Sequence, residues 1–63
     1  MDFSEVIKIG RIKKGYSQQD LATLTGLSLQ TIKNYELGKR RPRRRKVYML
    51  LEEILDVSHL ERN

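Results

Sequence analysis

Apolar residues recur along the chain at the spacing of helix faces, and the strict alternation of a strand is absent. Glycines and the single proline, Pro42, separate the periodic segments. The pattern predicts four helices, over about residues 3–14, 18–25, 29–37 and 43–55. Residues 58–63 are predicted to form one short turn or a frayed end. The expected fold class is therefore all-α, a compact bundle of four to five short helices in one domain over residues 1–63.

Polar residues and glycines mark the boundaries of these helices. Asp2, Ser17 and Ser28 stand directly before the first three helices, where a side-chain oxygen can accept a hydrogen bond from free backbone N–H groups. Gly26 and Gly38 follow the second and third helices and suit the left-handed backbone that often ends a helix. The predicted boundaries therefore rest on capping chemistry as well as on hydrophobic spacing.

The size and composition of the chain exclude several classes of function. Its 63 residues leave no room for a deep substrate cavity, and the absence of cysteine excludes disulfides and thiolate metal sites. Apolar runs are shorter than the roughly 18 residues of a membrane span, and the first residues lack a signal-peptide layout. The lone His59 lies near the end of the chain, with no paired carboxylates or phosphate-binding glycine loop elsewhere. We expect a cytoplasmic protein that is not an enzyme, with no metal, cofactor, membrane or small-molecule substrate.

The net charge of +5 is concentrated in one stretch of the chain. Residues 39–46 hold seven basic side chains, whereas residues 1–38 hold five basic and four acidic ones, and residues 47–63 hold one basic and four acidic ones. A patch of this density favours a polyanionic partner. The alternative is a solvated surface that only keeps the protein soluble.

The predicted second and third helices, joined by a tight turn that contains glycine, have the layout of a helix-turn-helix. Helical periodicity places Ile32 and Tyr35 on one side of the third helix and Gln30, Lys33 and Asn34 on the other. Side-chain amides can pair with adenine, and lysine can donate to guanine, so the polar side suits base edges. The alternative is that these are ordinary polar residues on an exposed helix.

Charges on the predicted fourth helix oppose its dipole. Basic residues 43–46 crowd its N-terminus, and Glu52, Glu53 and Asp56 lie toward its C-terminus. Each such placement costs about 0.3–1 kcal/mol. Phosphate binding at that N-terminus would offset the cost, because a phosphate would meet arginines and free backbone N–H groups together.

The stretch SQQDLATLTGLSLQTIKNYELGKRRP, residues 17–42, resembles the core signature of the phage repressor/Cro-like helix-turn-helix family, also called the XRE family. The matching positions are Gln18, Leu21, Ala22, Gly26, Ser28, Ile32, Tyr35, Glu36, Gly38 and Pro42. The resemblance extends back over Arg11 and Gly15 and forward to LDVS. It implies an all-α bundle that acts as a sequence-specific transcriptional regulator, typically a repressor. The implied partner is double-stranded DNA, with a two-fold operator bound by a homodimer.

The resemblance also implies roles for individual residues. Base reading would fall to Ser28, Leu29, Gln30, Lys33 and Asn34. Contacts to the DNA backbone would fall to Gln18, Lys39, Arg40, Arg41 and Arg43, and the charges at the start of the fourth helix add Arg44 to this set. Arg11 and Glu36 would form a partly buried ion pair that ties the first helix to the third.

Three features depart from the family pattern. Gly10 stands where many members have a bulky apolar residue, inside a helix where glycine costs about 0.5–1 kcal/mol against alanine. Either a neighbouring helix passes very close to it, or it is a weak point. Leu24 stands where a polar residue is common. The family's fifth helix, which often builds the dimer, is cut short at residues 58–63.

Two rival functions remain open on the same fold. An antitoxin or protein-interaction module would depend on exposed leucines, for which Leu24, Leu37 and Leu60 are the candidates. RNA binding is less favoured, because RNA readers commonly stack bases on exposed aromatic rings and only Tyr16 is expected to be exposed.

Overall fold

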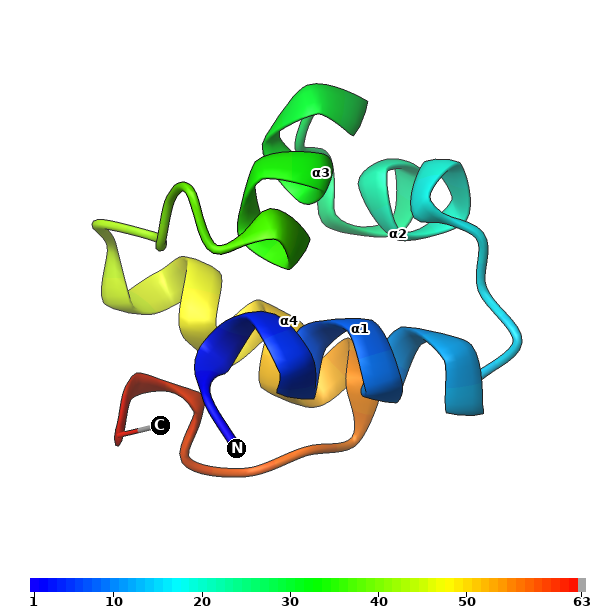
Figure 1. Cartoon of the computed structure of the whole chain (residues 1–63). Helices are drawn as coiled ribbons and strands as arrows, with labels where there is room; N and C mark the ends of the chain where they lie inside the picture. Colours follow the sequence, from blue (N-terminus) through cyan, green and yellow to red (C-terminus); the bar gives the residue numbers. More distant parts are fainter. Residues whose placement is uncertain (63) are drawn as a thin grey trace.

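The computed structural model describes residues 1–62 and is drawn in Figure 1. Its elements are α1 (Phe3–Lys13), α2 (Gln18–Thr25), α3 (Leu29–Leu37), α4 (Arg45–Leu55) and the short 3-10 helix η1 (Leu60–Arg62). Within residues 1–62 there is no strand, so the fold is all-α, as predicted. The molecule measures 25 × 21 × 20 Å, and α3 packs against both α1 and α2.

The ends of the first three helices lie within one residue of the predicted positions, and side chains cap each start. Asp2 accepts a hydrogen bond from the backbone N–H of Glu5 at 3.1 Å. Ser17 and Asp20 form a reciprocal capping box at the start of α2. The Ser28 side chain accepts a hydrogen bond from the backbone N–H of Thr31 at the start of α3. These caps satisfy N–H groups that would otherwise lack partners at each helix N-terminus.

The fourth helix begins later than predicted. It starts at Arg45 instead of residue 43, because Arg44 adopts an extended backbone with φ −100° and ψ 134°. The N-cap residue Arg44 makes no side-chain capping bond, and Pro42, which precedes the helix as predicted, is buried against the rest of the molecule. The predicted start was two residues early because Pro42 was taken as the last residue before the helix and no capping residue marked a later start.

Every element contributes to one core. The buried apolar side chains are Phe3, Ile7, Leu21, Ala22, Ile32, Tyr35, Tyr48, Leu51, Leu55 and Leu60. The Phe3 ring meets Tyr35 and Tyr48 edge to face, with centroids 5.6 and 5.5 Å apart. Such contacts add to the burial of apolar area and join the start of α1 to α3 and α4.

Leu60 corrects another prediction. The sequence placed it among the exposed leucines, whereas its exposed fraction is 0%. The turn η1 folds back against α1 and α4, so the C-terminal stretch is packed as a short turn (Figure 1). Leu24 and Leu37 are exposed, as expected.

Gly10 is buried where α1 meets the end of α4. A Cβ atom at this position would lie 3.4 Å from Leu55 Cβ and 3.5 Å from Val57 Cγ1. At these distances the added atom would make ordinary van der Waals contacts, so α1 and the end of α4 pack here at a normal separation. The contacts of Gly10 therefore do not require a glycine, and of the two interpretations the very close neighbouring helix is not supported.

Candidate nucleic-acid interface

The two sides of α3 differ as its periodicity predicts. Ile32 and Tyr35 are 0% and 6% exposed and face the core. Gln30 and Lys33 are exposed on the opposite side, and Asn34 is half-buried between them and the core. The Nε2 group of Gln30 donates to Oδ1 of Asn34 at 3.2 Å, so the two amides hold each other in place. Gln30 keeps its oxygen and one N–H outside this bond.

The start of α3 combines capping with exposure. Ser28 Oγ accepts from the Thr31 backbone N–H at 3.0 Å and lies 2.8 Å from the Thr31 hydroxyl. Leu29 is half-buried beside them. Thr31 is a polar neighbour of the predicted readers that sequence reasoning missed. The sequence could have indicated this residue, because Thr31 directly follows Gln30.

Residues 39–44, called the basic loop here, connect α3 to α4. The side chains of Lys39, Arg40, Arg43 and Arg44 are exposed and make no hydrogen bond or ion pair within residues 1–62. Arg41 differs from them. It donates to the carbonyl oxygen of Leu60 at 3.4 Å, and its guanidinium carbon lies 5.0 Å from the centre of the Phe3 ring.

An open groove of about 490 Å³ lies between α3 and the basic loop. Its lining consists of Ser28, Gln30, Thr31, Asn34, Tyr35, Arg40, Arg41 and Arg43. Three of the predicted base-reading residues thus share one groove with three arginines of the loop. Burial raises the pKa of Tyr35 beside this groove, with the neighbouring Tyr48 adding to the shift, so its hydroxyl stays neutral.

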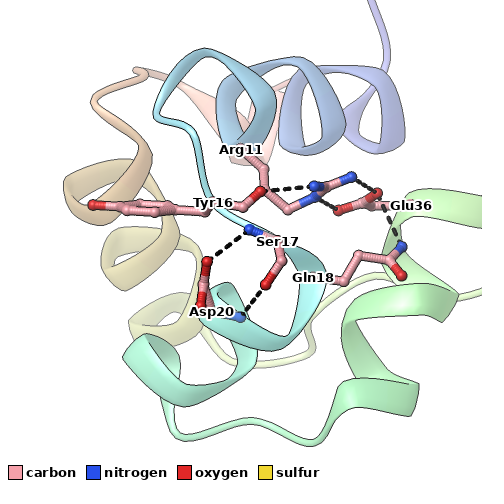
Figure 2. Close-up of polar contacts among 6 residues, drawn as sticks. All are labelled: Arg11, Tyr16, Ser17, Gln18, Asp20 and Glu36. Atoms are coloured by element: carbon pink, nitrogen blue, oxygen red, sulfur yellow. Dashed lines mark hydrogen bonds and ion pairs between the residues drawn. The ribbon is translucent and has the colours of Figure 1, made fainter.

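Arg11 and Glu36 form an ion pair at the base of α3, which Figure 2 shows with its neighbours. Arg11 Nε lies 2.6 Å from one Glu36 carboxylate oxygen, and its NH2 group lies 3.0 Å from the other. Arg11 also donates to the Tyr16 carbonyl at 2.8 Å. The two side chains are only 13% and 4% exposed. The hydrogen bond to Glu36 raises the pKa of Arg11, so the guanidinium remains charged.

Gln18 joins this cluster from the first turn of α2. Its Nε2 group donates to Glu36 at 3.2 Å, so part of the amide predicted to bind a phosphate is engaged inside the protein. The second N–H of the same group is left for an external acceptor. A smaller groove of about 290 Å³ brings Gln18 and Lys33 together with Lys8. Lys8 was missed by sequence reasoning, although it lies one helical turn before Arg11.

The sequence that adopts this geometry matches a known protein family. The model of the helix-turn-helix family matches residues 7–62. The chain belongs to the helix-turn-helix family. It is also 43% identical, over 56 residues, to the SPbeta prophage-derived uncharacterized HTH-type transcriptional regulator YonR of Bacillus subtilis (strain 168). That match covers 89% of this chain and 51% of YonR, so the chain spans about half the length of this relative. No solved structure gives a significant match.

The helix-turn-helix family, together with a relative named as a transcriptional regulator, points to a non-enzymatic domain. Among residues 1–62, no helix is long and apolar enough to cross a membrane. The same stretch contains no group of three or more acidic or histidine side chains that could hold a metal ion.

The charges on α4 of this helix-turn-helix domain have two different surroundings. At its N-terminus, Arg44 occupies the cap position without a side-chain hydrogen bond, and the first turn has no acidic residue. Arg45 reaches only a long contact with Glu61, at 3.6 Å between largely exposed side chains. Toward the C-terminus, Glu52 accepts a hydrogen bond from the Leu60 backbone N–H at 2.9 Å. One of the unfavourably placed acids thus has a structural use that the sequence did not reveal.

Proposed function

We propose that the chain is a sequence-specific DNA-binding regulator of transcription that uses α3 to read the major groove and the basic loop to hold phosphates. The observation that carries the proposal is the groove lined by Gln30 and Asn34 on one side and by Arg40 and Arg43 on the other. Groups suited to base edges and groups suited to phosphates lie together there, which is the combination that sequence-specific DNA recognition requires.

Base reading is assigned to the outward side of α3 and its start. Gln30 offers an acceptor and a donor, the pair of groups needed for the N6 and N7 atoms of adenine. Lys33 suits guanine, and Ser28, Leu29 and Asn34 complete the set. The bond from Gln30 to Asn34 supports this assignment because a side chain ordered before binding loses less entropy on binding.

Phosphate binding is assigned to exposed cations and to polar groups beside α3. Lys39, Arg40, Arg43 and Arg44 are exposed without internal partners in the described residues, so their charges are available to a polyanion. Gln18 and Lys8 would contact the backbone on the other side of α3, where both line the smaller groove. Two flanking sets of contacts would fix the register of the helix in the groove.

We also propose how the protein assembles on DNA, how it affects transcription and where in the cell it acts. A two-fold operator bound by a homodimer and repression as the regulatory effect follow the resemblance to phage repressors. A cytoplasmic location follows the composition of the chain, which lacks cysteine. The relative YonR is named as a transcriptional regulator of prophage origin, which supports the same class of function.

Selection of bound sequences from a pool of random DNA duplexes tests the proposal. We expect enrichment of one motif, with inverted half-sites if the operator has two-fold symmetry. A matched selection with Gln30→Ala should lose the preference at one or two positions of the motif. Failure of the parent protein to enrich any motif would contradict sequence-specific binding.

The exposed leucines support one alternative. Leu24 and Leu37 are 50% and 66% exposed, which suits a protein-interaction module or antitoxin, although the burial of Leu60 removes one of its three candidate residues. This alternative would replace the DNA proposal if Leu37→Ser abolished binding to a protein partner while the parent enriched no DNA motif.

A further inference from the structure

Leu60 is held at three points by distant parts of the chain. Its side chain is fully buried in the core. Its backbone N–H donates to Glu52 of α4 at 2.9 Å, and its carbonyl oxygen accepts from Arg41 of the basic loop at 3.4 Å. The turn η1 therefore links the body of α4 to the basic loop through one residue.

Arg41 makes a second contact with the core. Its guanidinium lies over the Phe3 ring, 5.0 Å from the ring centre, and that ring packs edge to face on Tyr35 and Tyr48. A hollow of about 130 Å³ at this place is lined by Asp2, Phe3, Ser4, Gly38 and Arg41. Contact with an aromatic face and a carbonyl oxygen orients a guanidinium more strictly than solvent does.

The position of Arg41 in the chain determines which neighbouring residues its contacts hold in place. Arg40 precedes it, the buried Pro42 follows it, and Arg43 comes next. Arg40 and Arg43 both line the groove beside α3. Fixing residues 41 and 42 therefore fixes the directions in which the two groove arginines leave the backbone, and a loop ordered in advance loses less freedom on binding.

We propose that Glu52, Leu60 and Arg41 form a positioning chain that holds the basic loop in its DNA-binding conformation. Arg41, which is also exposed and borders the groove, is then a positioning residue, and we assign the phosphate contacts to Lys39, Arg40, Arg43 and Arg44. This inference rests on the proposed function, because it concerns how the same loop meets DNA. It also explains why an acidic residue stands in the C-terminal half of α4, where it opposes the helix dipole. Glu52 holds η1, and η1 in turn contacts the basic loop through Leu60.

Two neighbouring acids of α4 provide a matched test. Glu52→Ala and Glu53→Ala remove the same negative charge, but only Glu52 binds the Leu60 N–H; Glu53 is exposed. Charge alone predicts that both variants bind DNA as tightly as the parent or more tightly. We expect Glu53→Ala to follow that rule, and Glu52→Ala to bind about threefold to tenfold more weakly, because a charge-assisted hydrogen bond is lost. Equal or tighter binding by both variants would overturn the proposal.

Affinities are measured at a temperature at which circular dichroism shows each variant to be folded.

A second pair of variants tests the same proposal if Glu52→Ala does not fold. Arg41→Lys keeps the charge but loses the planar group that reaches Phe3 and Leu60, whereas Arg40→Lys changes an exposed residue in the same way. We expect Arg41→Lys to weaken DNA binding more than Arg40→Lys, and the reverse order would contradict a positioning role.

A measurement on the free protein separates this inference from the proposed function. The ¹⁵N heteronuclear NOE of the amides in residues 39–44 reports loop order without DNA. We expect lower values in Glu52→Ala and Arg41→Lys than in the parent and in Glu53→Ala. Unchanged loop order would overturn the positioning chain even if the parent binds DNA. If the parent binds no DNA but loop order is lower in Glu52→Ala and Arg41→Lys than in the parent, the positioning chain stands and only the DNA-binding role is refuted.

Discussion

The Glu36 cluster, formed by Arg11, Gln18 and Glu36, and the basic loop both contain charged side chains. In the cluster these charges are mostly buried and paired, whereas in the basic loop most of them are exposed and, within residues 1–62, unpaired. Arg11 and Glu36 are 13% and 4% exposed, and hydrogen bonds from Arg11 and Gln18 surround the carboxylate. In the basic loop, Lys39, Arg40, Arg43 and Arg44 are exposed and have no internal partner within the described residues. The same chemical groups thus serve the fold in one region and remain accessible in the other.

The difference has an energetic meaning. A buried charge that loses its partner keeps its desolvation penalty, so breaking such a pair costs several kcal/mol. An exposed cation without a partner contributes little to stability, and its removal changes stability by about 0.5 kcal/mol or less. Stability and DNA binding should therefore respond to different sets of variants, and Arg41, with one contact on the Phe3 ring and another on Leu60, lies between the two sets.

The largest expected effect is on the Glu36 cluster. Glu36→Ala leaves the guanidinium of Arg11 nearly buried without its carboxylate, and we expect a loss of about 2–4 kcal/mol in the free energy of unfolding. Urea denaturation measures it, with Glu53→Ala as the exposed control that should change by less than about 0.5 kcal/mol. A Glu36→Ala variant that unfolds at the same urea concentration as the parent would show that the pair adds nothing to stability.

The next prediction distinguishes residues that contact bases from residues that contact phosphates. Asn34→Ala should lose about 1–3 kcal/mol of binding free energy on the preferred duplex and little on unrelated DNA. Arg40→Ala should weaken binding to both duplexes about equally and lower the salt slope by about one. Titration of both variants against the two duplexes checks this. If Asn34→Ala weakened binding to both duplexes equally, α3 would not be the reading helix.

A smaller effect concerns acid and the start of α1. The backbone N–H of Glu5, helped by Ser4, lowers the pKa of Asp2 from its ordinary value of 3.8. A lowered folded-state pKa means that the carboxylate stabilises the fold above that ordinary value and that this stability is lost as the pH falls through the folded pKa. Asp2→Asn should therefore flatten the fall in melting temperature below about pH 4, because asparagine caps without titrating. An equal fall in both proteins would assign the acid sensitivity to other groups.

The sequence was sufficient wherever local geometry decides the structure. The inward side of α3, with Ile32 and Tyr35, follows from helical periodicity, because residues three and four apart share a helix face. The helix ends at Gly26 and Gly38 follow from the left-handed backbone that glycine adopts at low cost, with φ of 73° and 77°. The family resemblance added the Arg11–Glu36 pair, which spans 25 positions of the chain and has no local signal.

Tertiary contacts account for what the sequence did not predict. Leu60 in a polar terminal stretch gives no sign of burial, because its cover comes from the tertiary packing of η1 on α1 and α4. Arg41 looks like its neighbours in a run of basic residues, and the folded positions of Phe3 and Leu60 distinguish it. Glu52 and Glu53 are adjacent identical residues, and the Leu60 N–H reaches only Glu52.

The salt dependence of DNA binding tests the central claim most directly, because it counts how many exposed cations meet phosphates. The parent protein is titrated against its selected duplex over a range of salt concentrations. With about three to five phosphate contacts per protein chain, the slope of log K against log salt should be about −3 to −5 for each half-site. A slope near zero would mean that the charges of the basic loop do not meet a polyanion, and would contradict the account.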